Sequence, residues 1–371
     1  MNRSSAEDDL LLVAATIPSL DQLAIERAKR RQRDLVKPPG SLGRLEEMAI
    51  HIAGISGTDR PHAERKLVLI FAADHGITVE SVSAYPSTVT AQMVHAFVAG
   101  TAAVSVLARH VGAEIVVVDV GVAAPLACDL PIEHRKVRWG TTSFMDGPAM
   151  RRPDAVAAMQ AGMAVVEARL ADGINVLALG KMGIGNTTAA AAVTAALLDL
   201  DPESVVGCGT GLDEAGVVRK LAVITQALAV NQPDACDAIG VLAAVGGLEI
   251  AALADAMIRA AAARIPVVLD GFITGSAALA AARLAPGLAP FLIAAHRSPE
   301  PGHGPILAAL GLRPLVELDM RLGEASGAVL AFGIIDAALA IHNAMGTFAE
   351  AAVSGPAGGA TTGPGHQPAI S

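Results

Sequence analysis

Aromatic residues are scarce in this chain of 371 residues and make up only 2% of it. Proteins that bind single-stranded nucleic acid stack its bases on aromatic side chains, so this scarcity argues against such a role. The formal net charge is -9, whereas a DNA- or RNA-binding surface needs an excess of lysine and arginine. We therefore expect no nucleic-acid partner.

Cysteine is rare as well, and Cys128, Cys208 and Cys236 form no Cys-x-x-Cys pair. This pattern is typical of reduced thiols in a cytoplasmic protein, and it fits neither a disulfide framework nor a zinc site. The acidic start of the chain lacks the basic region of a secretory signal. Charged residues or glycine interrupt the apolar runs before they reach ~18 residues, so we expect no membrane span.

Small apolar residues are abundant, since 53% of the chain is hydrophobic and 37 residues are glycine. Short apolar runs predict buried strands at 66–72, 113–121, 174–179, 266–272 and 290–295. Helical stretches lie between them, the longest at 153–170 and 240–263. This alternation predicts an α/β fold, a Rossmann-like parallel sheet covered by helices on both faces.

The same pattern predicts the domain organisation. We expect a smaller helical domain from residues 1–60 together with 328–346, and an α/β catalytic domain at 61–327. Residues 347–371 are predicted to be a disordered tail, because the chain from Gly355 onward is rich in Gly, Pro, Thr and Ala and has little apolar surface to bury.

One glycine-rich segment, Gly180 to Thr188, separates a predicted strand from an alanine-rich helix predicted at 189–198. Glycines let the backbone approach a ligand, and free N–H groups at a helix start favour phosphate. The segment reads Gly-Lys-Met-Gly-Ile-Gly-Asn-Thr-Thr, which is neither the P-loop pattern nor Gly-x-Gly-x-x-Gly. A purely structural turn is the alternative, and spacing alone does not decide between the two.

Polar motifs also follow other predicted strands, for example Asp74-His75 and the segment from His296 to His303. In a parallel sheet these motifs meet at one edge, which favours a ligand site there. The two histidines at 296 and 303 lack metal-site spacing, so we expect no metal. Glu324, flanked by small residues, is a candidate general base, with a helix-capping carboxylate as the alternative.

Together these motifs resemble the nicotinate-nucleotide–dimethylbenzimidazole phosphoribosyltransferase family of cobalamin nucleotide-loop assembly. The matching segments appear in family order over nearly the whole chain. They are 37–43 (Lys-Pro-Pro-Gly-Ser-Leu-Gly), 73–76 (Ala-Asp-His-Gly), 85–90, 182–188 (Met-Gly-Ile-Gly-Asn-Thr-Thr), 209–211 (Gly-Thr-Gly), 270–272 (Asp-Gly-Phe), 296–298 (His-Arg-Ser) and 322–324 (Leu-Gly-Glu).

The resemblance implies transfer of the phosphoribosyl group of nicotinate mononucleotide to 5,6-dimethylbenzimidazole, giving α-ribazole 5′-phosphate and nicotinate in vitamin B12 biosynthesis. It implies Glu324 as the base and Ala84, Tyr85 and Gln92 as the benzimidazole pocket. The residues implied for the phosphate, ribose and nicotinate are Lys181, Met182, Gly183, Ile184, Gly185, Asn186, Thr187, Thr188, Gly209, Lys220 and Ser298. No cofactor is implied, and the expected state is a cytoplasmic homodimer.

One position departs from the family pattern, because Lys181 stands where the family usually has Glu. Lys181 could contact the phosphate or pair with Glu324, and pairing would lower the pKa of Glu324 and weaken it as a base. A non-catalytic or altered-specificity nucleotide-binding homologue is therefore the alternative. A dinucleotide-dependent oxidoreductase is disfavoured, because no Gly-x-Gly-x-x-Gly follows the first strand.

Overall fold

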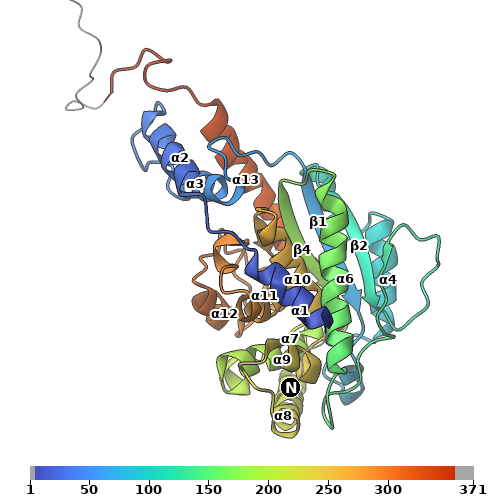
Figure 1. Cartoon of the computed structure of the whole chain (residues 1–371). Coiled ribbons are helices and arrows are strands. Elements are labelled where there is room, and N and C mark those ends of the chain that lie inside the picture. Colours follow the sequence, from blue (N-terminus) through green and yellow to red (C-terminus); the bar gives the residue numbers. More distant parts are fainter. Residues whose placement is uncertain (1–4, 356–371) are drawn as a thin grey trace, which may run out of the picture.

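The computed structural model describes residues 5–355 and is built around a six-stranded sheet in the order β3-β2-β1-β4-β5-β6. All neighbouring strands pair in parallel. The strands are β1 (Lys66–Ala73), β2 (Glu114–Gly121), β3 (Glu133–His134), β4 (Val176–Met182), β5 (Val267–Leu269) and β6 (Leu292–Ala294). The predicted α/β fold with a parallel sheet is confirmed (Figure 1).

Helices cover both faces of this sheet. They are α1 (Ser5–Ala15), α2 (Gln22–Asp34), α3 (Arg44–Ser56), α4 (Thr88–Val98), α5 (Ala103–His110), α6 (Arg152–Leu170), α7 (Asn186–Leu198), α8 (Glu214–Asn231), α9 (Ala238–Val245), α10 (Leu248–Ala262), α11 (Phe272–Leu284), α12 (His303–Leu310) and α13 (Ser326–Ala344). Short 3₁₀ turns form at η1 (Gly76–Glu80), η2 (Pro202–Ser204) and η3 (Ala289–Phe291).

Side chains of β1 alternate between two cores, as the pleat of a strand requires. Leu67, Leu69 and Phe71 belong to the larger core, which α6, α7, α9, α10 and α11 complete. Val68 and Ile70 belong to the second core, which α3, α4, α5 and α13 complete. Because both faces are buried, the strand is a continuous apolar run.

The order of the strands fixes where a ligand can bind. From β1 the chain first builds the sheet outward through β2 and β3, and then returns to place β4 on the other side of β1. The connections after β1 and β4 therefore run in opposite directions. In open α/β sheets, ligands bind at such a switch point, outside the carboxyl ends of the strands.

Small residues set the spacing of the helices on the larger core. Gly162 of α6 packs against the backbone of α10, where a Cβ would overlap the carbonyl oxygen of Ala252. Figure 1 shows α6 crossing the sheet, with α10 and α1 beside it. The abundance of alanine and glycine therefore serves close helix packing.

The prediction of a single helix over residues 240–263 is wrong. Gly246 and Gly247 divide it into α9 and α10. A Cβ at Gly247 would overlap the ring of His75, so a residue far away in the chain requires glycine at this position. The helices α1 and α12 and the two-residue strand β3 were not predicted from the sequence either.

A second helical group lies at one end of the molecule, where α3 packs against both α2 and α13 (Figure 1). α13 continues from this group onto β4 and β5, and α1 packs instead on α10 and α6. Thr347 bridges to Leu35, so the chain just after α13 contacts this group too. Residues 356–371 of the predicted tail lie outside the described residues.

Two segments, Thr88–His110 and Ser326–Ala344, are long and apolar enough to cross a membrane by composition alone. In the structure the first contains α4 and α5, and the second is α13. All three helices pack against strands of the sheet. Of the apolar window, 33% is buried in the first segment and 50% in the second.

Candidate active site

Two adjoining cavities lie at the carboxyl ends of the central strands. The polar cavity has a volume of ≈ 40 Å³ and is lined by Lys181, Thr187, Gly209, Thr210, Asp270, Gly271, Phe272, Ile273, Thr274, His296, Ser298, Glu300, Arg321, Leu322 and Gly323. The apolar cavity has a volume of ≈ 550 Å³ and is lined by Tyr85, Val89, Met93, Lys181, Met182, Gly183, Ile184, Asn186, Thr210, Arg321, Leu322 and Glu324. Four residues line both cavities, which therefore meet at Lys181, Thr210, Arg321 and Leu322.

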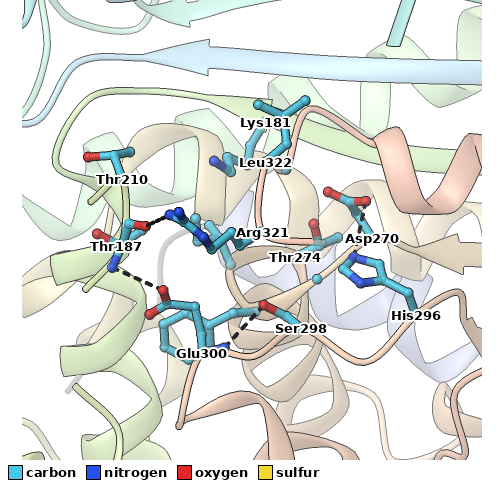
Figure 2. A pocket seen from close by; sticks show the side chains of 15 residues that line it. Lys181, Thr187, Thr210, Asp270, Thr274, His296, Ser298, Glu300, Arg321 and Leu322 are labelled. Atoms are coloured by element: carbon cyan, nitrogen blue, oxygen red, sulfur yellow. Dashed lines mark hydrogen bonds and ion pairs between the residues drawn. The ribbon is translucent and has the colours of Figure 1, made fainter. Parts of the chain in front are cut away.

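Figure 2 shows the polar cavity with Asp270 and His296 on one side and with Thr187, Glu300 and Arg321 on the other. The Glu300 carboxylate accepts a hydrogen bond from the Gly209 N–H at 3.0 Å. Nη1 of Arg321 donates to the carbonyl oxygen of the same glycine at 3.4 Å. The loop that carries Gly209 is thus held from both sides.

Lys220 supports the polar cavity from the buried side of its wall. Its Nζ donates to Thr187 Oγ1 at 3.0 Å and to the Gly207 carbonyl at 3.2 Å. The side chain is fully buried, and burial lowers the pKa of this lysine to about 8. Lys220 lines neither cavity. Its two hydrogen bonds tie α7 at Thr187 to the loop at Gly207.

The glycine-rich segment divides between strand, turn and helix. Gly180, Lys181 and Met182 belong to β4, so the prediction that the turn begins at Gly180 is wrong. A Cβ at Gly185, which has φ 94°, would lie 2.9 Å from Thr78. α7 then begins at Asn186.

The predicted residues of this segment lie in different places. Met182, Gly183, Ile184 and Asn186 line the apolar cavity, Thr187 lines the polar cavity, and Lys181 lines both. Gly185 and Thr188 line neither cavity. Gly209 and Ser298 both line the polar cavity.

Glu324 lies at the apolar cavity and is largely buried. Burial raises the pKa of its carboxyl, the Lys181 ammonium opposes this rise, and the Asp270 carboxylate adds to it. Lys181 does lower the pKa of Glu324, as the pairing alternative implies, but burial outweighs this effect and the net direction is upward. Within the described residues Glu324 Oε2 has no hydrogen-bond partner, and α13 has no side-chain cap, which removes the capping alternative.

Lys181 is buried between the two cavities. Burial lowers the pKa of its ammonium, while the carboxylates of Asp270 and Glu324 oppose that change through their charge. A Cβ at Gly323, which has φ 82°, would lie 2.9 Å from Lys181 Nζ. The glycine therefore makes room for the lysine.

The predicted benzimidazole residues are not all brought together. Tyr85 lines the apolar cavity, whereas Ala84 and Gln92 are exposed and are absent from its lining. Val89 and Met93 of α4 line it instead. Their spacing of four residues along a helix that follows Tyr85 is the signal that could have identified them.

Other lining residues, including Thr210, Asp270, His296, Glu300 and Arg321, were not predicted as site residues. Several of them belong to motifs that follow the strands, and this position was their signal. Within residues 5–355, no three His, Cys, Asp or Glu side chains gather closely enough to hold a metal ion.

A family model described as phosphoribosyltransferase matches residues 17–353, and the chain belongs to that family. It is 52% identical over 341 residues to the nicotinate-nucleotide–dimethylbenzimidazole phosphoribosyltransferase of Roseiflexus sp. (strain RS-1), and the match covers 92% of this chain and 97% of the relative. The enzyme of the same name from Chloroflexus aggregans is 51% identical over 338 residues, covering 91% and 96%.

Solved structures agree. The crystal structure of the enzyme of that name from Thermus thermophilus matches with a TM-score of 0.86 and 45% identity, covering 91% of this chain and all of that one. The family resemblance carried by the sequence motifs is confirmed.

Proposed function

We propose that this protein transfers the phosphoribosyl group of nicotinate mononucleotide to 5,6-dimethylbenzimidazole, giving α-ribazole 5′-phosphate and nicotinate for the nucleotide loop of cobalamin. The main observation in support is the position of Glu324. Its carboxylate is buried, has a raised pKa and lies at the apolar cavity, which adjoins the polar cavity. An aromatic base and a phosphorylated sugar need that pair of environments side by side.

The polar cavity suits the phosphate and ribose. Thr187 lies in the first turn of α7, which begins at Asn186, and the positive end of the helix dipole there favours an anion. Ser298 adds a hydroxyl donor, and Arg321 adds a positive charge where the two cavities meet. Lys220 fixes the hydroxyl of Thr187 from below.

The apolar cavity suits the planar base. Tyr85, Met93, Met182 and Leu322 offer apolar surface to an aromatic ring. The Glu324 carboxylate takes the ring N–H proton as the other ring nitrogen attacks the anomeric carbon of the ribose. The bond from that carbon to the pyridinium nitrogen breaks, and its electron pair leaves with nicotinate, so holding both rings in line is the main task of the cavities.

Lys181 does not favour the alternative of a non-catalytic homologue. Burial keeps the pKa of Glu324 raised although Lys181 acts against it. At the junction of the cavities, the ammonium faces the region where the negative charges of the nucleotide would lie. We assign Lys181 to substrate binding on that ground.

We propose that the protein is a cytoplasmic homodimer with a smaller helical domain formed mainly by α2, α3 and α13. The exposed thiols of Cys128, Cys208 and Cys236 suit a reducing compartment. Analytical ultracentrifugation measures the oligomeric state, and a monomer at micromolar concentration would contradict the dimer.

The test of the activity is to incubate the purified protein with nicotinate mononucleotide and 5,6-dimethylbenzimidazole and to detect α-ribazole 5′-phosphate by mass. A parallel sample carries Lys181→Glu. Product in both samples supports the proposal and makes Lys181 a tolerated variation. Product from Lys181→Glu alone would mean that the unmodified chain is the altered homologue.

A further inference from the structure

We propose that Asp270 is the positioning residue for the base: its carboxylate holds the turn that carries Glu324 at the apolar cavity. This inference rests on the proposed function, because it takes Glu324 to be the proton acceptor. Asp270 follows β5, whereas Glu324 lies two residues before the start of α13. The two residues are far apart in the sequence and come together only in the folded chain.

The turn has an unusual backbone conformation, and within it Ser326 donates to the Gly323 carbonyl from its N–H at 2.9 Å and from its hydroxyl at 2.7 Å. Gly323, Glu324 and Ala325 follow one another with φ values of 82°, 63° and 71°. Residues with a Cβ rarely adopt this left-handed region, and two in succession need support from their surroundings. Such strain at a site residue points to a function for whatever supplies the support.

Asp270 supplies it through three backbone hydrogen bonds. Its Oδ2 accepts from the Ala325 N–H at 3.2 Å. Its Oδ1 accepts from the N–H groups of Gly327 at 2.8 Å and Ala328 at 3.3 Å. These donors belong to the start of α13, where N–H groups lack partners within the helix and a negative charge is favourable.

The opposite side of the turn is closed by the sheet. A Cβ at Gly180 of β4 would lie 2.7 Å from the Ala325 nitrogen and 2.7 Å from the Glu324 carbonyl carbon. His296 follows β6, and its Nε2 lies 3.7 Å from Asp270 Oδ1. The turn is thus clamped between groups from three neighbouring strands, and Asp270 makes the direct bonds.

Asp270 also lines the polar cavity, so a direct contact with substrate is the competing role. The two roles predict different kinetics. A positioning residue governs the turnover of bound substrate, whereas a binding residue governs KM. The charged groups that act on Glu324 are Lys181 and Asp270, and His296 faces Asp270 from the next strand. A pH profile therefore reports on Asp270 as well.

The test compares Asp270→Asn with the parent in kcat, KM and pH dependence. We expect kcat to fall about 100-fold, as misplacement of a reacting group by about an ångström does, with KM changed little for either substrate. The acid limb of the kcat profile moves to lower pH, because the variant loses the charge that raises the pKa of Glu324. The proposal would be overturned if Asp270→Asn kept the kcat of the parent and the acid limb of its kcat profile. A variant that changed only KM would overturn it too.

Two further variants complete the design. Asp213→Asn is the matched control, since Asp213 caps α8 through the Gly216 N–H at 2.8 Å and lines neither cavity. Ala325→Gly added to Asp270→Asn restores part of kcat, because glycine adopts the left-handed conformation without strain. The double variant also serves if Asp270→Asn does not fold. Failure of both to fold would make Asp270 a residue of the fold alone and overturn the positioning role.

Glu324→Gln is measured alongside to separate the two claims. If it keeps full turnover, the assignment of the base fails, and the role of Asp270 fails with it. If it is inactive while Asp270→Asn matches the parent, only the positioning role fails.

Discussion

The imidazole of His75 and the carboxylate of Glu249 form a fully buried pair, with Nε2 2.7 Å from Oε1 and neither side chain exposed. The pair lies directly behind the turn that leads from β4 to α7. A Cβ on Gly183 would lie 3.3 Å from the His75 ring, and one on Gly185 would lie 3.2 Å from its Cβ. The lining of the apolar cavity at Gly183 and Ile184 thus rests on a buried polar pair.

Glu249→Gln should therefore weaken the fold near the cavity. Glutamine keeps the shape and one acceptor oxygen but lacks the carboxylate charge, and a buried hydrogen bond to a charged group contributes about 1.5–3 kcal/mol. Urea unfolding measures the change. The control is Glu26→Gln, because Glu26 and its partner Lys29 are both exposed and such a pair adds little to stability. Equal losses in the two variants would contradict the prediction.

Lys181→Met should move the acid limb of the kcat profile to higher pH. The Lys181 ammonium lowers the pKa of Glu324, and the neutral side chain removes that effect while burial and Asp270 still raise the pKa. Steady-state kinetics across the pH range measure the limb. Lys66→Met is the control, because Lys66 pairs with Asp336 at 3.1 Å and lines neither active-site cavity. An unchanged limb would show that Lys181 does not act on Glu324, and a limb that moves to lower pH would contradict the sign of its effect.

Asp255 in α10 should make the protein less stable as pH rises. Within the described residues neither carboxylate oxygen has a hydrogen-bond partner, and burial raises the pKa from 3.8 to about 8. Between these values the unfolded chain releases a proton that the folded chain keeps, so the free energy of unfolding falls, by roughly 4 kcal/mol at pH 7. Above about pH 8 this contribution levels off.

The variant Asp255→Asn removes the ionisable group while it keeps the shape of the side chain. Its free energy of unfolding should lack the decline between about pH 4 and about pH 8, measured by urea unfolding at several pH values. Asp9→Asn, an exposed change on α1, should keep the decline of the parent. A parent whose stability does not fall over this range would contradict the prediction.

Gly162→Ala should destabilise the packing of α6 on α10. The added Cβ would overlap the carbonyl oxygen of Ala252, and backbone cannot move aside as a flexible side chain can. Overpacking of this kind costs about 1–3 kcal/mol. Gly333→Ala in α13 is the matched control, since no atom lies within 4 Å of its added Cβ, and it should stabilise by about 0.5–1 kcal/mol. Thermal unfolding of both variants measures the difference, and two changes of the same sign would refute it.

The sequence predicted the features that local patterns determine. Apolar runs located the main strands, and the motifs after them located the edge of the sheet where the cavities lie. It did not predict features imposed from a distance. The lack of space for a side chain at Gly247 depends on His75, and the turn at Glu324 is supported by Asp270, 55 positions before Ala325.

Individual side chains show the same limit. The position of Lys181 inside β4 was missed, because glycine and lysine are typical of a turn and only strand pairing places them in the sheet. Gln92 was chosen by resemblance, yet the face of α4 that meets the cavity carries Val89 and Met93. The roles of the site residues in catalysis stay predictions.

The most direct measurement of the central claim is the rate of α-ribazole 5′-phosphate formation by the parent, by Glu324→Gln and by Glu317→Gln. Glu317 is a matched control, because its carboxylate is exposed and pairs with Arg297 at 3.8 Å. We predict product from the parent and from Glu317→Gln, and a loss of about 10²–10⁴-fold in Glu324→Gln with nucleotide still bound. Full turnover by Glu324→Gln, or no product from the parent, would contradict the account.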